Sequence, residues 1–147
     1  MADKDSRLNV LDSFPLQTYD KIRYADTDRQ GHVNNAMFST FLETGRVEFM
    51  SDTKKGMLAD NCEFVIANSN LNLLGEINWP GNVDIGTQVI KVGNSSVCLF
   101  QRLFQDDRCV ASAETVIVQM NETTRKSQPL SDYARSVFIQ YQSADHT

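Results

Sequence analysis

The second half of the chain contains a series of strand-like segments joined by short turns, and this series constrains the fold more than any other feature. Segments rich in apolar and β-branched residues occupy positions 63–79, 83–92, 97–104 and 109–120. The breaks between them read WPGN, GNSS and QDDR. Turn signals of two to four residues are typical of antiparallel hairpins. The sequence therefore predicts a four-stranded antiparallel meander, with a bulge or bend where the alternation shifts phase at Leu74 and Gly75.

A helix is predicted before these strands, over residues 34–50. Asn34 or Asn35 is a natural N-cap. Apolar positions recur at steps of three and four residues and form one stripe, at Phe38, Phe41, Leu42, Gly45 and Phe49. A glycine inside a helix costs about 1 kcal/mol relative to alanine, so Gly45 indicates close packing on another backbone. Glu43 and Arg46 lie three residues apart and are expected to form a surface ion pair.

The remaining segments complete a single predicted domain of residues 1–147. A first strand is expected from residue 17 to about residue 25, and a short terminal helix over residues 130–140. Residues 1–15 form a polar lead-in that is expected to be partly loose. One helix combined with antiparallel strands predicts the α+β class, with a core over residues 17–130.

The last strands carry apolar side chains on both faces, which indicates that both faces are covered. A single helix covers one face only. A second subunit is the simplest cover for the other face, so the sequence predicts a homo-oligomer. The two sets of residues are Val97, Leu99 and Leu103 against Cys98, Phe100 and Phe104.

Composition excludes several classes of protein. A formal net charge of −5 argues against a broad nucleic-acid surface. No apolar run approaches the length of a membrane span, and MADKDSRLNV lacks the apolar stretch of a secretory signal, so a cytoplasmic location is expected. The three cysteines lack metal or redox spacing and are expected to be reduced thiols, mostly packing groups. With His32 and His146 as the only histidines, no metal site is predicted.

The stretch YADTDRQGHVNNAMF, residues 24–38, concentrates short polar side chains between the first strand and the helix. Aspartate, asparagine and glycine are ordinary turn formers. The same residues also suit an active-site loop, because a carboxylate can act as nucleophile or general base. The amides at a helix N-terminus can hold an oxyanion. The residues alone leave both interpretations open.

The loop pattern D-x-D-x-x-G-H-V-N-N resembles that of the hotdog-fold acyl-CoA thioesterases, in particular the 4-hydroxybenzoyl-CoA thioesterase-like group. The resemblance covers residues 17–130 and extends to the helix FLETGRVEFM, to LGEINWPGNVDIGTQVIKVGNSS and to CVASAETVIVQMNETTRKSQPL. It implies a hotdog fold, in which a curled antiparallel sheet wraps around one long central helix. It also implies hydrolysis of an acyl-CoA, with no cofactor because coenzyme A is part of the substrate. Homodimers or homotetramers with sites at the subunit interface are the implied assemblies.

The resemblance assigns roles residue by residue. The second aspartate, Asp28, matches the catalytic carboxylate, whereas Asp26 is expected to shape the turn. His32 matches the histidine of the related acyl-ACP thioesterases, whose loop reads D-x-N-x-H-V-N-N, and Gln30 replaces their asparagine. The predicted catalytic residues are Asp28, His32 and Asn35, the last through its backbone amide together with the amides of Val33 and Asn34. Glu43 is the alternative candidate for the attacking carboxylate.

Predicted substrate contacts are Val33, Asn34, Trp79, Ser95 and Ser96, with Lys91, Arg125 and Lys126 as further candidates for the coenzyme A phosphates.

Three other functions remain open alongside the thioesterase. A non-catalytic acyl-CoA-binding module is expected to lack the loop carboxylate or to carry a DNA-binding segment. An acyl-ACP substrate is disfavoured by Gln30. A hotdog dehydratase is disfavoured because Asp28 and His32 are close together, without an Asn-Pro pair. The acyl group, the choice between nucleophile and base for Asp28, and the choice between dimer and tetramer stay undetermined by the sequence.

Overall fold

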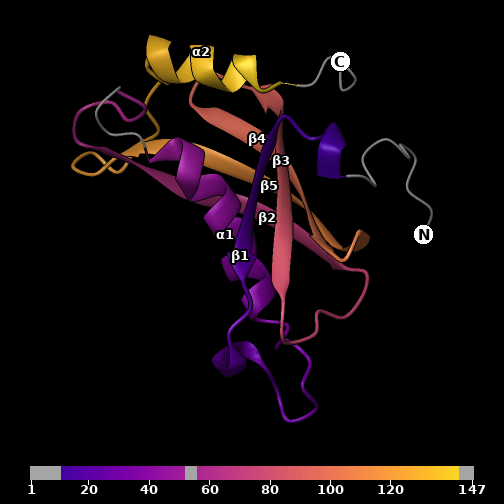
Figure 1. The fold of residues 1–147 in the computed structure, drawn as a ribbon. Helices are drawn as coiled ribbons and strands as arrows, with labels where there is room; N and C mark the ends of the chain where they lie inside the picture. The colour runs from indigo at the N-terminus through magenta and orange to yellow at the C-terminus, as the bar shows by residue number, and fades with distance from the viewer. Residues whose placement is uncertain (1–10, 52–55, 143–147) are drawn as a thin grey trace.

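The computed structural model describes residues 11–51 and 56–142 of the chain. Five antiparallel strands form one sheet, and helices pack against it (Figure 1). The α+β class is therefore confirmed. The strands are β1 Leu16–Lys21, β2 Cys62–Leu73, β3 Asn82–Val92, β4 Ser96–Gln105 and β5 Arg108–Asn121. The helices are η2 Leu11–Ser13, η3 Tyr24–Asp26, α1 Met37–Met50 and α2 Asp132–Gln140.

The strand order in the sheet is β1-β3-β4-β5-β2. Only β3, β4 and β5 form the predicted meander, because β2 pairs with β5 instead of with β3. The prediction of a four-stranded meander was wrong on this point. Residues 74–81 separate β2 from β3 and form a long connection from the edge strand β2 to β3, which lies next to the opposite edge strand β1. Strand β2 ends at Leu73, and the chain bends at Gly75, in agreement with the predicted bulge or bend there. A bulge that was not predicted lies within β2, between Ile66 and Asn68.

Helix α1 packs its predicted apolar stripe on the sheet. Phe38, Phe41, Leu42 and Gly45 are buried, whereas Phe49 is half-buried. The helix has 14 residues and begins three positions later than predicted, so it is shorter than the long central helix expected. The reason is local: Asn34 Oδ1 accepts a hydrogen bond from Ala36 N–H (3.0 Å), which holds the two asparagines in a turn before the helix.

Gly45 lies where α1 comes closest to the sheet. A methyl group at this position would lie 2.6 Å from Ile85 Cγ2 and 2.8 Å from Gln101 Nε2. Gln101 Nε2 donates to Leu42 O and to Thr87 Oγ1, each at 3.0 Å, and so ties the helix to β3 and β4. The predicted close packing at Gly45 is confirmed.

The opposite face of the sheet is covered in part by this chain itself. Phe14, which follows η2, stacks on Phe100 and meets Phe104 edge-on, with ring centroids 6.0 and 6.2 Å apart. The two-sided apolar pattern had suggested that a second subunit covers this face. For this part of the face, Phe14 provides the cover instead.

The predicted terminal helix is confirmed as α2. Ser131 caps it by accepting a hydrogen bond from Ala134 N–H (3.0 Å), and Ala134 and Phe138 are buried. In Figure 1, α2 lies at the end of the sheet remote from the loop between β1 and α1. Within residues 11–51 and 56–142, no helix combines the length and apolar character that a membrane crossing requires.

Candidate active site

The loop between β1 and α1 folds back on itself as a narrow hairpin. Thr27 and Val33 pair as an isolated antiparallel bridge, and Asp28 N–H donates to His32 O at 2.8 Å. The chain reverses at Gly31, whose φ of +81° is strained for any residue with a side chain. The loop therefore has a defined shape that fixes the direction of its polar side chains.

Asp28 lies at the surface with its carboxylate anchored on one side. Its Oδ1 accepts hydrogen bonds from Gln30 N–H (2.8 Å) and His32 N–H (3.2 Å). Its Oδ2 has no hydrogen bond to the described residues. The two amides orient the carboxylate and leave one oxygen open to solvent, which is the arrangement that a nucleophile or general base requires.

Asp26, the other aspartate of the pattern, has a structural role. Its side chain is 2% exposed, and it accepts bonds from Arg23 N–H (2.8 Å), Nε (3.2 Å) and Nη2 (2.9 Å). The hydrogen bond to Asp26, reinforced by its charge, raises the pKa of Arg23. Asp26 O also accepts from Asn34 N–H at 2.8 Å, so Asp26 joins the start of the loop to the approach to α1. This agrees with the turn-shaping role expected for Asp26.

His32 meets a carboxylate that the sequence analysis did not single out. Its Nε2 lies 3.2 Å from Oε2 of Glu76, and the two side chains are 34% and 65% exposed. Backbone pairing of His32 with Asn78 brings the connection between β2 and β3 against the loop. Glu76 is far from His32 in sequence, and the stretch LGEINW that contains it assigned no role to this residue, so no local signal could have indicated the contact.

Of the three amides predicted to hold an oxyanion, two already donate within the chain. Val33 N–H donates to Ile77 O and Asn34 N–H to Asp26 O, each at 2.8 Å. Asn35 N–H has no acceptor in the described part of the molecule. The predicted donor set therefore narrows to Asn35, at the turn that leads into α1.

Trp79 lies at the end of the molecule that contains the loop between β1 and α1. It is partly exposed and meets Tyr24 of η3 edge-on, with ring centroids 5.3 Å apart. Ser95 and Ser96 lie at the other end of β3, which as an 11-residue strand is about 36 Å long. Within one chain the fold therefore brings Trp79 to the loop and separates Ser95 and Ser96 from it. Lys91, Arg125 and Lys126 also lie at the remote end, where Arg125 Nη1 is 3.6 Å from Glu63 Oε1.

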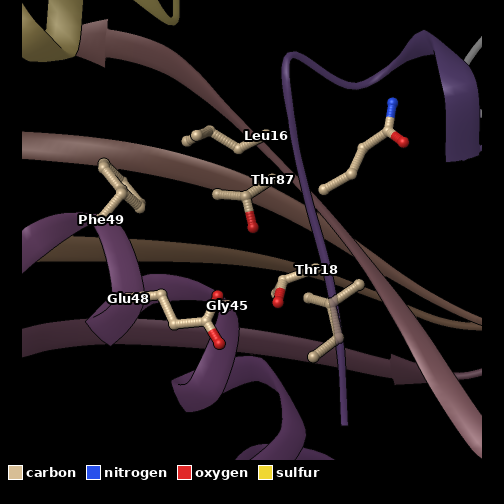
Figure 2. A pocket seen from close by; sticks show the side chains of 8 residues that line it. Leu16, Thr18, Gly45, Glu48, Phe49 and Thr87 are labelled. Atoms are coloured by element: carbon tan, nitrogen blue, oxygen red, sulfur yellow. The ribbon is translucent and has the colours of Figure 1, made fainter.

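Several cavities surround α1. One of about 260 Å³ lies at the base of the loop, between Lys21, Arg23, Met37 and Phe41. Another of about 230 Å³ lies between α1 and strands β1 and β3, where Thr18, Thr87 and Glu48 surround Gly45 (Figure 2). The second cavity contains no residue of the loop and no predicted catalytic residue. A third cavity opens on the β2 side of the helix.

Both the sequence and the fold of this chain are similar to those of known proteins. Residues 22–138 match the profile of the thioesterase-like superfamily. The chain belongs to the thioesterase-like superfamily. The predicted family and the predicted class of enzyme, a thioester hydrolase, are thereby confirmed. The sequence of this thioesterase is also 31% identical over 119 residues to the long-chain acyl-CoA thioesterase FadM of Escherichia coli, covering 78% of this chain and 90% of FadM.

Solved structures share the fold of this thioesterase. The YbaW probable thioesterase from Escherichia coli is 28% identical, with a TM-score of 0.73, and the match covers 87% of this chain and 99% of that chain. The PA5185 protein from Pseudomonas aeruginosa has a TM-score of 0.81 at 21% identity, covering 92% of this thioesterase and 96% of that chain.

Proposed function

We propose that this thioesterase hydrolyses the thioester bond of an acyl-CoA, giving the free acid and coenzyme A. The observation that carries the proposal is the Asp28 carboxylate, which is anchored through Oδ1, on the loop that leads to the Asn35 amide; neither Oδ2 nor this amide has a hydrogen-bond partner among residues 11–51 and 56–142. The 31% identity to an acyl-CoA thioesterase supports the choice of thiol. Thiol release from acyl-CoAs, with and without the Asp28 carboxylate, tests the proposal.

The proposed reaction begins at Asp28 Oδ2. This oxygen either attacks the acyl carbonyl carbon, forming a mixed anhydride that water then hydrolyses, or removes a proton from a water molecule that attacks the same carbon. In both routes the carbonyl oxygen becomes an oxyanion. Asn35 N–H is the proposed donor to that oxyanion, because it has no acceptor in the described part of the chain and lies at the positive end of α1. Collapse of this tetrahedral oxyanion breaks the carbon–sulfur bond and gives the mixed anhydride in the first route and the free acid in the second, and the coenzyme A thiolate leaves and takes up a proton.

His32 is the proposed second polar group of the reaction. Its ring is held near Glu76, and its backbone N–H donates to Asp28 Oδ1. A histidine held in this way can orient the attacking water or give a proton to the departing thiolate. Glu76 is then a positioning residue, because it acts through His32.

The remaining predicted contacts fit a site built from two subunits. Trp79 and Tyr24 form an exposed aromatic pair beside the loop and are proposed to contact the substrate. Ser95 and Ser96 are too far from the loop of their own chain to share its site. We propose that they serve the site of a second subunit, as contacts for the coenzyme A phosphates.

The edge of β2 is the proposed contact between subunits. This strand of 12 residues pairs with β5 on one side, and no described strand lies along its other edge. Its sequence contains no proline and only one charged residue, Glu63. Long edge strands without such protection pair readily with another chain. Ile66 of β2 and Val47 of α1 are both about half exposed, as expected for residues covered by a second copy. The proposed assembly is a homodimer or a homotetramer of such dimers.

The proposed interface predicts that Ile66→Lys lowers the oligomeric state. A buried lysine without a partner opposes association, so the variant is expected to be mainly monomeric at micromolar concentration in analytical ultracentrifugation. Ile139→Lys on α2 is the matched control, because Ile66 and Ile139 are 53% and 52% exposed. The control is expected to keep the wild-type mass. An unchanged mass for Ile66→Lys would contradict pairing through this face.

A non-catalytic acyl-CoA-binding module is the alternative function, because the bonds from Gln30 and His32 to Asp28 would also serve a simple turn. An acyl-ACP thioesterase and a hotdog dehydratase are further alternatives, disfavoured by Gln30 and by the loop sequence. A cytoplasmic location remains a prediction.

A further inference from the structure

A cavity of about 310 Å³ lies between α1 and β2, beside the exposed edge of the sheet. This volume is at the lower end of the range for small-molecule sites, so it suits a short acyl group or the end of a longer one. Its walls are mostly apolar, with two charged side chains. The lining includes Glu43, Arg46, Val47, Phe64 and Ile66.

Arg46 is the unusual member of this lining. The residue is 8% exposed, and among the described residues its side chain bonds to a neutral amide: Nη1 donates to Gln101 Oε1 at 3.3 Å. Glu43 lines the same cavity but is not within ion-pair distance of Arg46, so the predicted surface ion pair is not formed between these two described residues. Burial lowers the pKa of Arg46, and the Glu43 carboxylate opposes this effect.

A guanidinium has five N–H donors and no acceptor. Removing such a group from water is costly unless oxygen atoms accept its hydrogen bonds. One long bond to an amide satisfies only a small part of this requirement. The remaining donors of Arg46 can be satisfied by water in the open cavity, and a ligand that displaces this water must supply oxygen acceptors in its place.

The position of the guanidinium relates the cavity to the proposed reaction. Gln101 accepts from Arg46 and donates to Leu42 O, so the guanidinium lies level with Leu42, one turn back along α1. Seven residues separate Leu42 from Asn35, which corresponds to about 10 Å along the helix axis. Asn35 lies in the turn that leads into α1. Ser39, Glu43 and Arg46 follow at steps of four and three, so these three residues share one face of the helix. An acyl chain extending from the Asn35 amide along this face reaches Arg46.

We propose that Arg46 is a specificity-determining residue that binds an oxygen acceptor carried by the acyl group, a hydroxyl or a carboxylate placed about 10 Å from the thioester carbonyl. The inference rests on the proposed thioesterase function and adds the substrate class. A plain hydrocarbon chain in this cavity leaves Arg46 without acceptors, whereas a hydroxyl accepts from Arg46 and can donate to Glu43. A carboxylate pairs with the guanidinium directly.

The test compares thioesters of coenzyme A with equal chain lengths, bearing a terminal methyl, hydroxyl or carboxylate group. Wild type is expected to show a kcat/KM at least 10-fold higher for an oxygen-bearing chain than for the plain chain. A preference for the hydroxyl identifies a hydroxyacyl substrate, and a preference for the carboxylate identifies a dicarboxylic half-thioester. In Arg46→Met the ratio is expected to fall to about one. Arg108→Met, the same change at an exposed position, is expected to keep the wild-type ratio.

Two results would overturn this inference while leaving the proposed function standing. The first is a wild-type enzyme that hydrolyses the plain chain as well as or better than the oxygenated ones. The second is an Arg46→Met variant that keeps the ratio and loses subunit association in ultracentrifugation, because Arg46 would then pair with Glu43 of a second copy. Absence of thiol release from every chain would reject the proposed function and, with it, this inference. Melting temperatures of both variants confirm that each one is folded.

Discussion

Asp28→Asn is expected to lower kcat/KM for acyl-CoA hydrolysis by about 10²- to 10⁴-fold, the range attributed to a positioned general base. Asparagine keeps the side-chain oxygen that accepts from Gln30 and His32, at 2.8 and 3.2 Å. The loop should therefore retain its shape while Oδ2 is replaced by a neutral amide that can neither attack nor accept a proton. Thiol release measured at saturating and subsaturating substrate separates kcat from KM, and the loss is expected mainly in kcat.

The control for this variant is Asp60→Asn, which removes an exposed carboxylate near the start of β2, remote from the loop. Its activity should match that of wild type. Both variants should melt within a few degrees of wild type, because surface substitutions of this kind change stability by about 0.5 kcal/mol or less. Full activity in a folded Asp28→Asn variant would reduce Asp28 to a turn residue and direct attention to His32 and Glu43.

Gly45→Ala is expected to destabilise the protein, although alanine is the better helix former. Helix propensity favours alanine by about 1 kcal/mol. The added methyl, however, would lie 2.6 Å from Ile85 Cγ2, 2.8 Å from Gln101 Nε2 and 3.2 Å from Thr87 Oγ1. Either α1 must move off the sheet or Gln101 must give up its bonds to Thr87 and Leu42. Overpacking costs about 1–3 kcal/mol and the loss of the two hydrogen bonds about 1 kcal/mol each, so that after the gain of about 1 kcal/mol the net loss is about 2–4 kcal/mol.

Urea unfolding followed by circular dichroism measures this loss as a lower midpoint at an unchanged slope. Gly75→Ala is the matched control, because a methyl group there meets its nearest neighbour, Val110 Cγ1, at an ordinary 3.7 Å. The control should stay within about 0.5 kcal/mol of wild type. A Gly45→Ala variant as stable as wild type would contradict this expectation, because α1 could then move relative to the sheet at little cost in free energy.

Patterns that are local in sequence predicted the fold well. The stripe that includes Phe38, Phe41 and Leu42 repeats at the period of one helix, and this period is independent of what the helix packs against. The hairpins of β3, β4 and β5 follow from turns of a few residues. The position of β2 beside β5 could not be predicted in the same way, because strand partners joined by a long connection are chosen by the packing of the whole sheet.

In the candidate site too, the sequence predicted features that depend on local patterns and did not predict contacts between distant segments. The loop pattern indicated Asp28, and the glycine of that pattern, Gly31, has the positive φ that favours glycine in a turn. The approach of Glu76 to His32 depends on a connection from another part of the sheet, which no local pattern encodes. Arg46 and Gln101 are 55 residues apart in sequence, so the neighbouring Glu43 was the natural but incorrect choice of partner for Arg46. Phe14 likewise covers Phe100 and Phe104 from a segment that the sequence analysis had treated as a lead-in.

The most direct test of the proposed function is thiol release by the purified wild-type protein from a panel of acyl-CoAs of differing length and polarity. The proposal predicts saturable release of coenzyme A for at least one class of acyl chain, with one free acid formed for each thiol. The contradicting result is no release from any member of the panel while an acyl-CoA raises the melting temperature. The protein would then bind acyl-CoA without hydrolysing it.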